Sequence, residues 1–229
     1  MSTLRNHSLS LFFLVIFIAA LVGQAIAGHA EYNNDEIAHA RLLNEEPETL
    51  SFWRYVVTSN FGQAVMENWQ SEYLQFFLFI FATVWLIQRG STESKKPGEE
   101  GPESDKEQRI GRHANEDSPR WARTGGWRTA VFSRSLGLLM GALFLLTWLA
   151  SSFAGWAAFN SEQLGDKLDP VSWAGYLGGA DFWNRSFQNW QSEMLAVGSM
   201  AIFSVYLRQR GSPESKPVGV AHAETGQTG

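Results

Sequence analysis

The sequence predicts an all-α integral membrane protein, a four-helix bundle built from two tandem two-helix repeats. Three observations predict this class. Apolar residues are concentrated in four long runs, although the mean hydropathy of the 229-residue chain is slightly negative. The pentapeptide Asn-Trp-Gln-Ser-Glu occurs twice, at residues 68–72 and 189–193. Each copy leads into an apolar run that ends in Gln-Arg-Gly-Ser, at residues 88–91 and 209–212.

Composition excludes several classes of function. The chain has no cysteine, which excludes disulfides, thiol chemistry and any Cys-ligated zinc or iron–sulfur site. Its formal net charge of −5 argues against nucleic acid as the main partner, because nucleic-acid-binding domains usually carry a basic surplus. The ten Trp and sixteen Phe residues are a high aromatic content that suits membrane–water interfaces.

The first apolar run extends from Leu9 to Ile26 and has the length of one membrane-spanning helix. Arg5 before it and Ala25-Ile26-Ala27 before Gly28 also match a cleavable signal peptide. Residues at both ends of this run recur 127 positions later, in the middle of the chain, where a signal peptide has no use. We therefore expect a retained helix, with a mature N-terminus at Gly28 as the alternative.

The polar segment that follows is expected to lead into a second span. Ser51–Val56 is expected to form a short amphipathic helix at the bilayer surface. Asn60, with Gln63 three residues later, matches a capping box. It predicts a helix from about Phe61 to Gln88, which is expected to cross the membrane from Trp69 onward.

The second half repeats this plan. Leu136–Ala158 is the third spanning run, and Trp190–Leu207 is the fourth. Ser172 and Trp173 begin a second short surface helix, and Asp181 takes the cap position that corresponds to Asn60. A Gly137-xxx-Gly141 pattern at the start of the third run allows close contact between helices.

Composition changes abruptly between the halves, where Gly, Pro, Glu, Lys, Ser and Arg dominate. Such a segment buries too little apolar surface to offset its chain entropy. The expected parts are a first two-span repeat, a disordered cytoplasmic linker, a second two-span repeat and a disordered cytoplasmic tail, at residues 1–95, 96–130, 131–212 and 213–229. The basic end of the linker, from Arg120 to Arg134, contains Trp121 and Trp127 and is expected to lie against anionic headgroups.

Lysine and arginine counts predict the orientation. Residues 89–134 carry ten, whereas the two other connecting loops carry two each. The positive-inside rule places the linker and both termini in the cytoplasm. The two other connecting loops, which are acidic, then lie outside. Because each repeat has two spans, both repeats insert in the same sense, which counts against inverted-repeat transporters.

The candidate functional residues are Asn68, Glu72, Asn189 and Glu193. Each glutamate is expected at the outer end of a span, with an asparagine one helical turn before it. Two carboxylates related by a twofold axis offer a site for a cation or for protons between the repeats. The alternative, which we favour, is structural: the two motif copies pair across the bundle and their Asn and Ser side chains bond helix backbone.

A metal site and an enzyme active site are not expected. His29, Glu31, Asp35 and His39 form a conceivable cluster, but the second repeat has Trp156 in place of His29, and the spacing matches no standard site. The predicted spans contain only uncharged polar residues at depth, and the chain lacks a phosphate loop, a nucleophile elbow and a zinc-protease motif. We therefore expect no cofactor.

With its Asn-Trp-Gln-Ser-Glu and Gln-Arg-Gly-Ser motifs, the chain resembles an uncharacterised family of small bacterial membrane proteins, known as a domain of unknown function. The resemblance covers both halves and implies two tandem two-span units in the bacterial inner membrane. It implies no activity and adds no site residues. The expected function is non-enzymatic, through assembly or partner binding, with the bilayer, a homo-oligomer or another membrane protein as partners. The alternative is a small channel or transporter with a site near Glu72 and Glu193.

Overall fold

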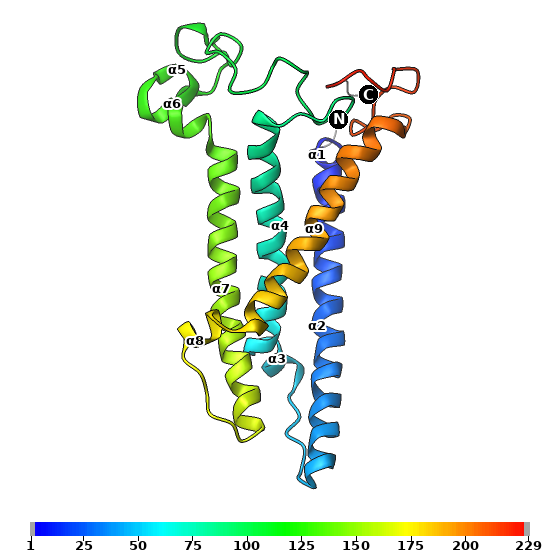
Figure 1. Ribbon diagram of the computed structural model, residues 1–229, viewed down its shortest axis with the longest axis vertical. Helices are drawn as coiled ribbons and strands as arrows, with labels where there is room; N and C mark the ends of the chain where they lie inside the picture. The colour runs from blue at the N-terminus through cyan, green and yellow to red at the C-terminus, as the bar shows by residue number, and fades with distance from the viewer. Residues whose placement is uncertain (1–2, 227–229) are drawn as a thin grey trace. The chain divides into compact units, whose positions relative to one another are not determined.

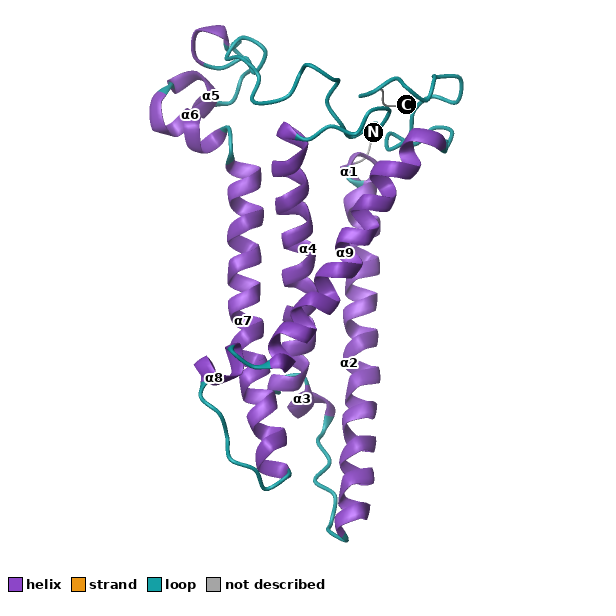
Figure 2. Ribbon diagram, in the orientation of Figure 1, coloured by secondary structure: helices purple, strands orange, loops and turns teal. Residues whose placement is uncertain are grey.

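The computed structural model describes residues 3–226, which form helices and loops and contain no strand (Figure 2). The predicted all-α class is confirmed. Four long helices are α2 (Ser8–Leu43), α4 (Ser59–Trp85), α7 (Ser135–Gly165) and α9 (Ala180–Tyr206), labelled in Figure 1. The short elements are α1 (Thr3–Asn6), α3 (Phe52–Tyr55), η1 (Gly111–His113), α5 (Arg120–Thr124), α6 (Gly126–Phe132) and α8 (Trp173–Leu177).

Two of the long helices, α2 and α7, are long and apolar enough to cross a membrane. Their most apolar 18-residue windows have mean hydropathies of 2.6 and 1.9. Few side chains in these windows are buried; Phe12 and Phe13 on α2, for example, are 59% and 61% exposed. The core helix of a soluble protein would bury such a window. Helices α4 and α9 do not reach this hydropathy, because each contains a polar Asn-Trp-Gln-Ser-Glu segment.

Contacts divide the chain into two compact units. The first unit takes residues Met1–Val65 and Phe153–Val171, and the second takes Met66–Ser152 and Ser172–Gly229. Each unit therefore combines segments from both halves of the sequence. Both copies of the Asn-Trp-Gln-Ser-Glu motif and both copies of the Gln-Arg-Gly-Ser motif belong to the second unit.

The first unit is organised around Tyr55, which is 6% exposed. Its ring lies 5.7 Å from that of Tyr32 and 5.5 Å from that of Phe61, between centroids. Gly28 leaves room for the Tyr55 hydroxyl, which a Cβ at that position would overlap. Helix α2 continues without a break past Ala27, so the chain on both sides of the conceivable signal-peptide cleavage point belongs to one 36-residue helix.

The short surface helices are confirmed as helices, but the predicted caps of the following long helices are wrong. Helix α4 begins at Ser59, and Thr58 accepts a hydrogen bond from the Phe61 amide through its Oγ1 at 3.3 Å. Asn60 therefore lies inside the helix. Helix α9 begins at Ala180 after Gly179, so Asp181 also lies inside the first turn, where its carboxylate bonds other side chains.

In the second unit, α7 packs closely on α4 through the small residues that the sequence indicates. A Cβ added to Gly141 would lie 3.0 Å from the Phe77 ring, and one added to Gly137 would lie 3.9 Å from Ile80. Small residues allow helix backbones to approach in this way. The predicted close contact at the Gly137-xxx-Gly141 pattern is therefore confirmed.

An aromatic cluster joins α7 to α9 in the second unit. Trp148 of α7 lies at its centre and donates a hydrogen bond from Nε1 to Ser186 Oγ at 3.5 Å. Each tilted, stacked or edge-on pair contributes about 0.5–1.5 kcal/mol beyond its buried area. The neighbours whose ring centroids lie 5.8–6.1 Å from the Trp148 ring are Phe144, Phe182, Trp183 and Trp190.

The connection between α4 and α7 is irregular. Its helical parts in the structure are η1, α5 and α6, the longest of which has seven residues. After α9, the described part of the tail, to residue 226, is also composed of turns and loops. The disorder expected for residues 96–130 and 213–229 stays a prediction.

Candidate functional site

The two copies of the Asn-Trp-Gln-Ser-Glu motif contact each other in the second unit. Trp190, the second residue of the α9 copy, donates a hydrogen bond from Nε1 to Oε1 of Gln70, the third residue of the α4 copy, at 2.8 Å. Gln70 and its neighbour Ser71 are each 1% exposed. A buried amide oxygen without a donor costs about 1–3 kcal/mol, so the indole satisfies a group that needs a partner.

Serine and asparagine of the motif bond helix backbone, as the structural alternative expects. Ser71 Oγ donates to the Asn68 carbonyl at 2.9 Å, and Ser192 Oγ donates to the Asn189 carbonyl at 2.8 Å. Asn189 Nδ2 donates to the Arg185 carbonyl at 2.9 Å, one turn earlier in α9. The Asn68 side chain is exposed. The two serines thus make the same local bond in both copies.

The two predicted carboxylates lie close enough to interact. Glu193 is half-buried, and its carboxylate interacts electrostatically with that of Glu72. Glu72 itself is exposed. Of the four candidate residues, the structure thus brings together Glu72 and Glu193.

A charged network, which the sequence analysis missed, lies one helical turn before the motif. Arg185 Nε donates to both carboxylate oxygens of Asp181 at 3.2 Å, and Arg185 Nη1 lies 3.9 Å from Glu67 Oε2. Tyr176 Oη donates to Asp181 Oδ2 at 3.3 Å. The Asp181–Arg185 spacing of four residues on a helix is a recognisable signal for an ion pair. Glu67 is far away in sequence and carries no such signal.

This environment perturbs two groups of the network. Burial raises the pKa of the Tyr176 phenol, and the negative charges of Asp181 and Glu67 raise it further. Burial by itself would lower the pKa of Arg185, but the Glu67 and Asp181 carboxylates outweigh it, so that this pKa is raised. The network therefore holds a permanently charged arginine against two carboxylates.

In the first unit, His29 bonds the backbone. Its Nε2 lies 2.7 Å from the Leu50 carbonyl oxygen, which can only accept, so the ring donates from this atom. Trp156 Nε1, 127 positions later, donates to the Val171 carbonyl at the same 2.7 Å. Within residues 3–226, no group of three or more His, Asp or Glu side chains is placed to hold a metal ion.

An asparagine clamp accompanies each of these bonds. Asn33 Nδ2 donates to the Leu50 carbonyl at 2.9 Å, and the Leu50 amide donates to Asn33 Oδ1 at 2.8 Å. Asn160 makes the same two bonds with Val171, both at 2.9 Å. Asn160 follows Asn33 by 127 positions and Val171 follows Leu50 by 121, which are the offsets of the sequence repeat.

A longer repeated segment follows α4 and α9. Residues 88–95 and 209–216 both read Gln-Arg-Gly-Ser-x-Glu-Ser-Lys, and we call them the first and second turn motifs. In each motif the second serine, Ser94 or Ser215, accepts from the amide of the leading glutamine at 2.9 Å. Gly90 and Gly211 have φ values of +89° and +82°, in the left-handed region that favours glycine.

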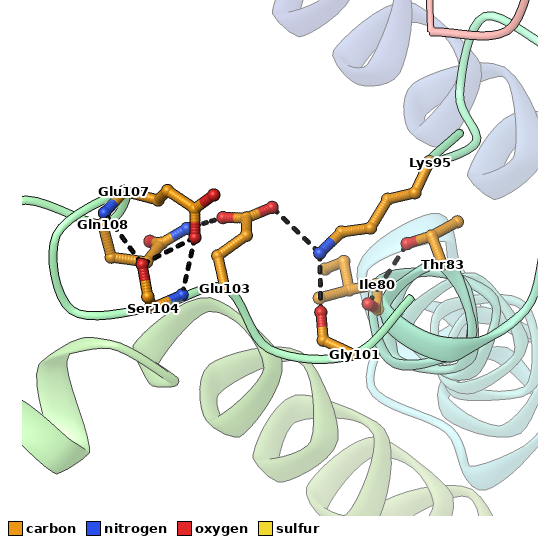
Figure 3. A network of polar contacts seen from close by, with 8 residues as sticks. All are labelled: Ile80, Thr83, Lys95, Gly101, Glu103, Ser104, Glu107 and Gln108. Atoms are coloured by element: carbon orange, nitrogen blue, oxygen red, sulfur yellow. Dashed lines mark hydrogen bonds and ion pairs between the residues drawn. The ribbon is translucent and has the colours of Figure 1, made fainter. Parts of the chain in front are cut away.

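The lysines that end the turn motifs bind backbone carbonyls. Lys95 Nζ donates to the Gly101 carbonyl at 2.7 Å and pairs with Glu103 at 2.9 Å, and Gln108 holds the same carboxylate (Figure 3). Lys216 is 1% exposed. Its Nζ donates to carbonyls of the first turn motif and of the tail, at Gly90 (2.6 Å), His222 (2.9 Å) and Glu224 (3.2 Å).

The two turn motifs are also joined to each other. Thr92 Oγ1 donates to the Glu214 carbonyl at 3.3 Å, and the Glu93 and Glu214 side chains are hydrogen-bonded. Burial raises the pKa of the Glu93 carboxyl, and the Glu214 bond and charge add to this.

Comparison with known proteins places the chain in a family. No curated protein and no solved structure is a significant match to it. The family described as a domain of unknown function, DUF6766, matches residues 1–227. This match extends over nearly the whole chain, whereas the resemblance inferred from the two motifs covered both halves without the linker and tail. The chain therefore belongs to the DUF6766 family.

Proposed function

We propose that this protein is a non-enzymatic, multi-pass membrane protein that acts through assembly or binding of another membrane protein. The observation that carries the proposal is the bond between Trp190 and Gln70. Gln70, one of the most buried polar residues of the repeated motif, is engaged in joining α4 to α9, and the equally buried Ser71 bonds the backbone of its own helix. Polar groups that are hydrogen-bonded within the protein in this way are not free to bind a substrate.

We further propose four spans, formed by α2, α4, α7 and α9 as two tandem repeats. The apolar, exposed surfaces of α2 and α7 support two of these spans. The repeated bonds at Asn33 and Asn160, and in the two turn motifs, support a duplicated unit. In α4 and α9 the polar motif lies near the middle of the helix, where the apolar part begins, and there the headgroups of a bilayer would meet it.

The proposed location is the bacterial cytoplasmic membrane, with both termini and residues 89–134 in the cytoplasm. The ten lysines and arginines of that segment support this orientation. In lipid, helix association depends on packing and on hydrogen bonds between helices, because lipid supplies little hydrophobic drive. The partner is then a second copy of the chain or another membrane protein that covers part of the exposed apolar surface.

The proposal is tested by asking whether the protein assembles without conducting. The full chain is purified in mild detergent, its subunit number is measured by native mass spectrometry, and ion flux is measured after reconstitution in liposomes. We expect a defined oligomer or a stable complex with a co-purifying membrane protein, and flux equal to that of empty liposomes. A monomer that conducts ions would contradict the proposal.

A second candidate, a small channel or transporter, is favoured by one observation: the interaction of Glu193 with Glu72. Two carboxylates from the two repeats can take up a cation or proton between them. The double variant Glu72→Gln, Glu193→Gln separates the candidates. A flux that is present in the native protein and absent in this variant would establish the second candidate, whereas no flux in either supports the first.

A further inference from the structure

The α5–α6 segment, residues 120–134, has an unbalanced positive charge. It contains Arg120, Arg123, Arg128 and Arg134 and no acidic residue. Asp117 is the last acidic residue before it, and the next one is Glu162, near the end of α7. Arg120, Arg123 and Arg128 are exposed, and Arg123 also donates to the Glu116 carbonyl at 3.2 Å, so these guanidinium groups can reach an external anion.

Large aromatic and aliphatic side chains of this segment are exposed beside the arginines. Trp127 is 67% exposed and Trp121 is 42% exposed. Their ring centroids lie 6.1 Å apart in an edge-on arrangement, and the Arg128 guanidinium carbon lies 5.5 Å from the Trp127 ring. Val131 and Phe132 add further exposed apolar surface. Tryptophan and arginine side by side suit the boundary between headgroups and acyl chains.

The two short helices are joined by a hydrogen bond and are called here the α5–α6 element. Thr129 of α6 is buried, and its Oγ1 donates to the Trp121 carbonyl at 2.6 Å, which ties α6 to α5. This bond and the contact between the two indoles place Trp121 and Trp127 side by side.

The position of this element relates it to a candidate span. Helix α6 ends at Phe132 and α7 begins at Ser135, so that only two residues separate them. Figure 1 shows α5 and α6 at the N-terminal end of α7. If α7 crosses the bilayer, this end lies at the headgroups. The inference thus rests on the part of the proposed function that places α7 in a membrane.

We propose that the α5–α6 element is a binding surface for anionic phospholipid headgroups of the leaflet that α7 enters. The guanidinium groups of Arg120, Arg123 and Arg128 pair with lipid phosphates, for which the planar, permanently charged fork of arginine is suited. Trp121 and Trp127 insert at the acyl boundary. The positive charge of residues 120–134, and their position directly before α7, favour a lipid surface over a soluble protein partner.

The test uses the full chain, which has no native cysteine, so that one introduced cysteine can be labelled selectively. Thr124→Cys, an exposed position at the end of α5, is labelled with an environment-sensitive fluorophore, and the protein is reconstituted in phosphatidylcholine nanodiscs with increasing phosphatidylglycerol. We expect a blue shift that follows the anionic fraction and weakens with added salt, because salt screens the attraction. A triple variant, Arg120→Gln, Arg123→Gln and Arg128→Gln, loses most of this shift at every anionic fraction, because each arginine contributes about 1 kcal/mol to the attraction.

A matched control changes the same charge elsewhere in the linker: Lys96→Gln, Lys106→Gln and Arg112→Gln. This control retains the native response. An equal loss in both triple variants, or an emission that is independent of anionic lipid, overturns the inference. Alkaline carbonate extraction of the same preparations tests the underlying membrane insertion. Protein that resists extraction but shows no lipid response contradicts only the lipid surface, whereas protein that is extracted contradicts the proposed function itself.

Discussion

The indole of Trp190 donates its hydrogen bond to the buried side-chain oxygen of Gln70 at 2.8 Å, so that one copy of the repeated motif satisfies the other. The two residues lie 120 positions apart, on α9 and α4. The bond gives the buried polar side chain of the first motif copy a partner on the second. The two copies are not equally buried: Gln70 is buried, whereas its counterpart Gln191 is exposed, so the same substitution has different effects at the two positions.

Replacing Gln70 by leucine destabilises the protein, because the Trp190 N–H loses its acceptor. We expect a loss of about 1–3 kcal/mol in the free energy of unfolding. Gln191 is the equivalent residue of the second copy and is exposed, so Gln191→Leu is the matched control and changes the stability by about 0.5 kcal/mol or less. Unfolding by sodium dodecyl sulfate in mixed micelles measures both. Equal effects at the two positions would contradict the pairing.

Enlarging Gly141 separates α7 from α4. A Cβ at this position lies 3.0 Å from the Phe77 ring, and a leucine side chain cannot be accommodated without moving the helix. We expect Gly141→Leu to cost about 1–3 kcal/mol in micelle unfolding. A Cβ added to Gly198 of α9 would meet no neighbouring atom within 4 Å, so Gly198→Leu serves as the control for loss of a helical glycine. A similar cost for both variants would argue against the close contact.

Removing the negative charge of Asp181 lowers the pKa of Tyr176. Burial is the main cause of the raised pKa and remains in the Asp181→Asn variant, whereas the charge of Asp181 and its bond to the phenol are lost. The native protein and the Asp181→Asn variant are each titrated to alkaline pH with and without the additional change Tyr176→Phe. The difference in ultraviolet absorbance within each pair reports the ionisation of the Tyr176 phenol alone. We expect ionisation at lower pH in Asp181→Asn than in the native protein. An unchanged titration would show that the carboxylate does not act on the phenol.

The contact between the two turn motifs weakens as the pH rises. The pKa of Glu93 in the folded protein is raised above its ordinary value of 4.5, so the stability from its protonated form is fully present below that value. This contribution is lost as the pH rises through the folded-state pKa. Hydrogen exchange at the Gly226 amide, which donates to the Ser91 carbonyl at 3.0 Å, reports on the contact. After correction for intrinsic rates, its protection should fall with increasing pH.

Two variants control this measurement. Glu93→Gln keeps the hydrogen-bonding capacity and removes the titration, so we expect its protection to be independent of pH over the same range. Glu99→Gln changes an exposed carboxylate of the linker and should behave as the native protein. Equal pH dependence in native and Glu93→Gln proteins would assign the effect to another group.

The sequence was sufficient for features that depend on local pattern. Long apolar runs identify α2 and α7, and the recurrence of Ser51 and Ser172 before aromatic residues identifies α3 and α8. The prediction that the motif copies pair needed only their repetition and their polar content. The Gly137-xxx-Gly141 contact followed from residue size alone.

Features that depend on contacts between residues far apart in sequence, or on which of two neighbouring residues caps a helix, were not predictable from local pattern. Thr58 and Asn60 are both good capping residues, and the cap is Thr58, so that α4 begins two residues earlier than the capping box indicates. His29 and Trp156 differ in chemistry yet donate the same bond, so a comparison of residue types suggests that the two positions are unrelated. The Glu67–Arg185 pair joins helices that are remote in sequence.

Cysteine accessibility in intact cells tests the central claim, that a helical hairpin has been duplicated and inserted twice in the same sense. Single cysteines at the exposed positions Glu46, Glu99 and Asp166 have no background in this cysteine-free chain. A membrane-impermeant maleimide is applied to spheroplasts and to inverted vesicles. We predict that Glu46→Cys and Asp166→Cys react only in spheroplasts and Glu99→Cys only in inverted vesicles. Labelling of Glu46→Cys and Glu99→Cys from the same side would contradict the account.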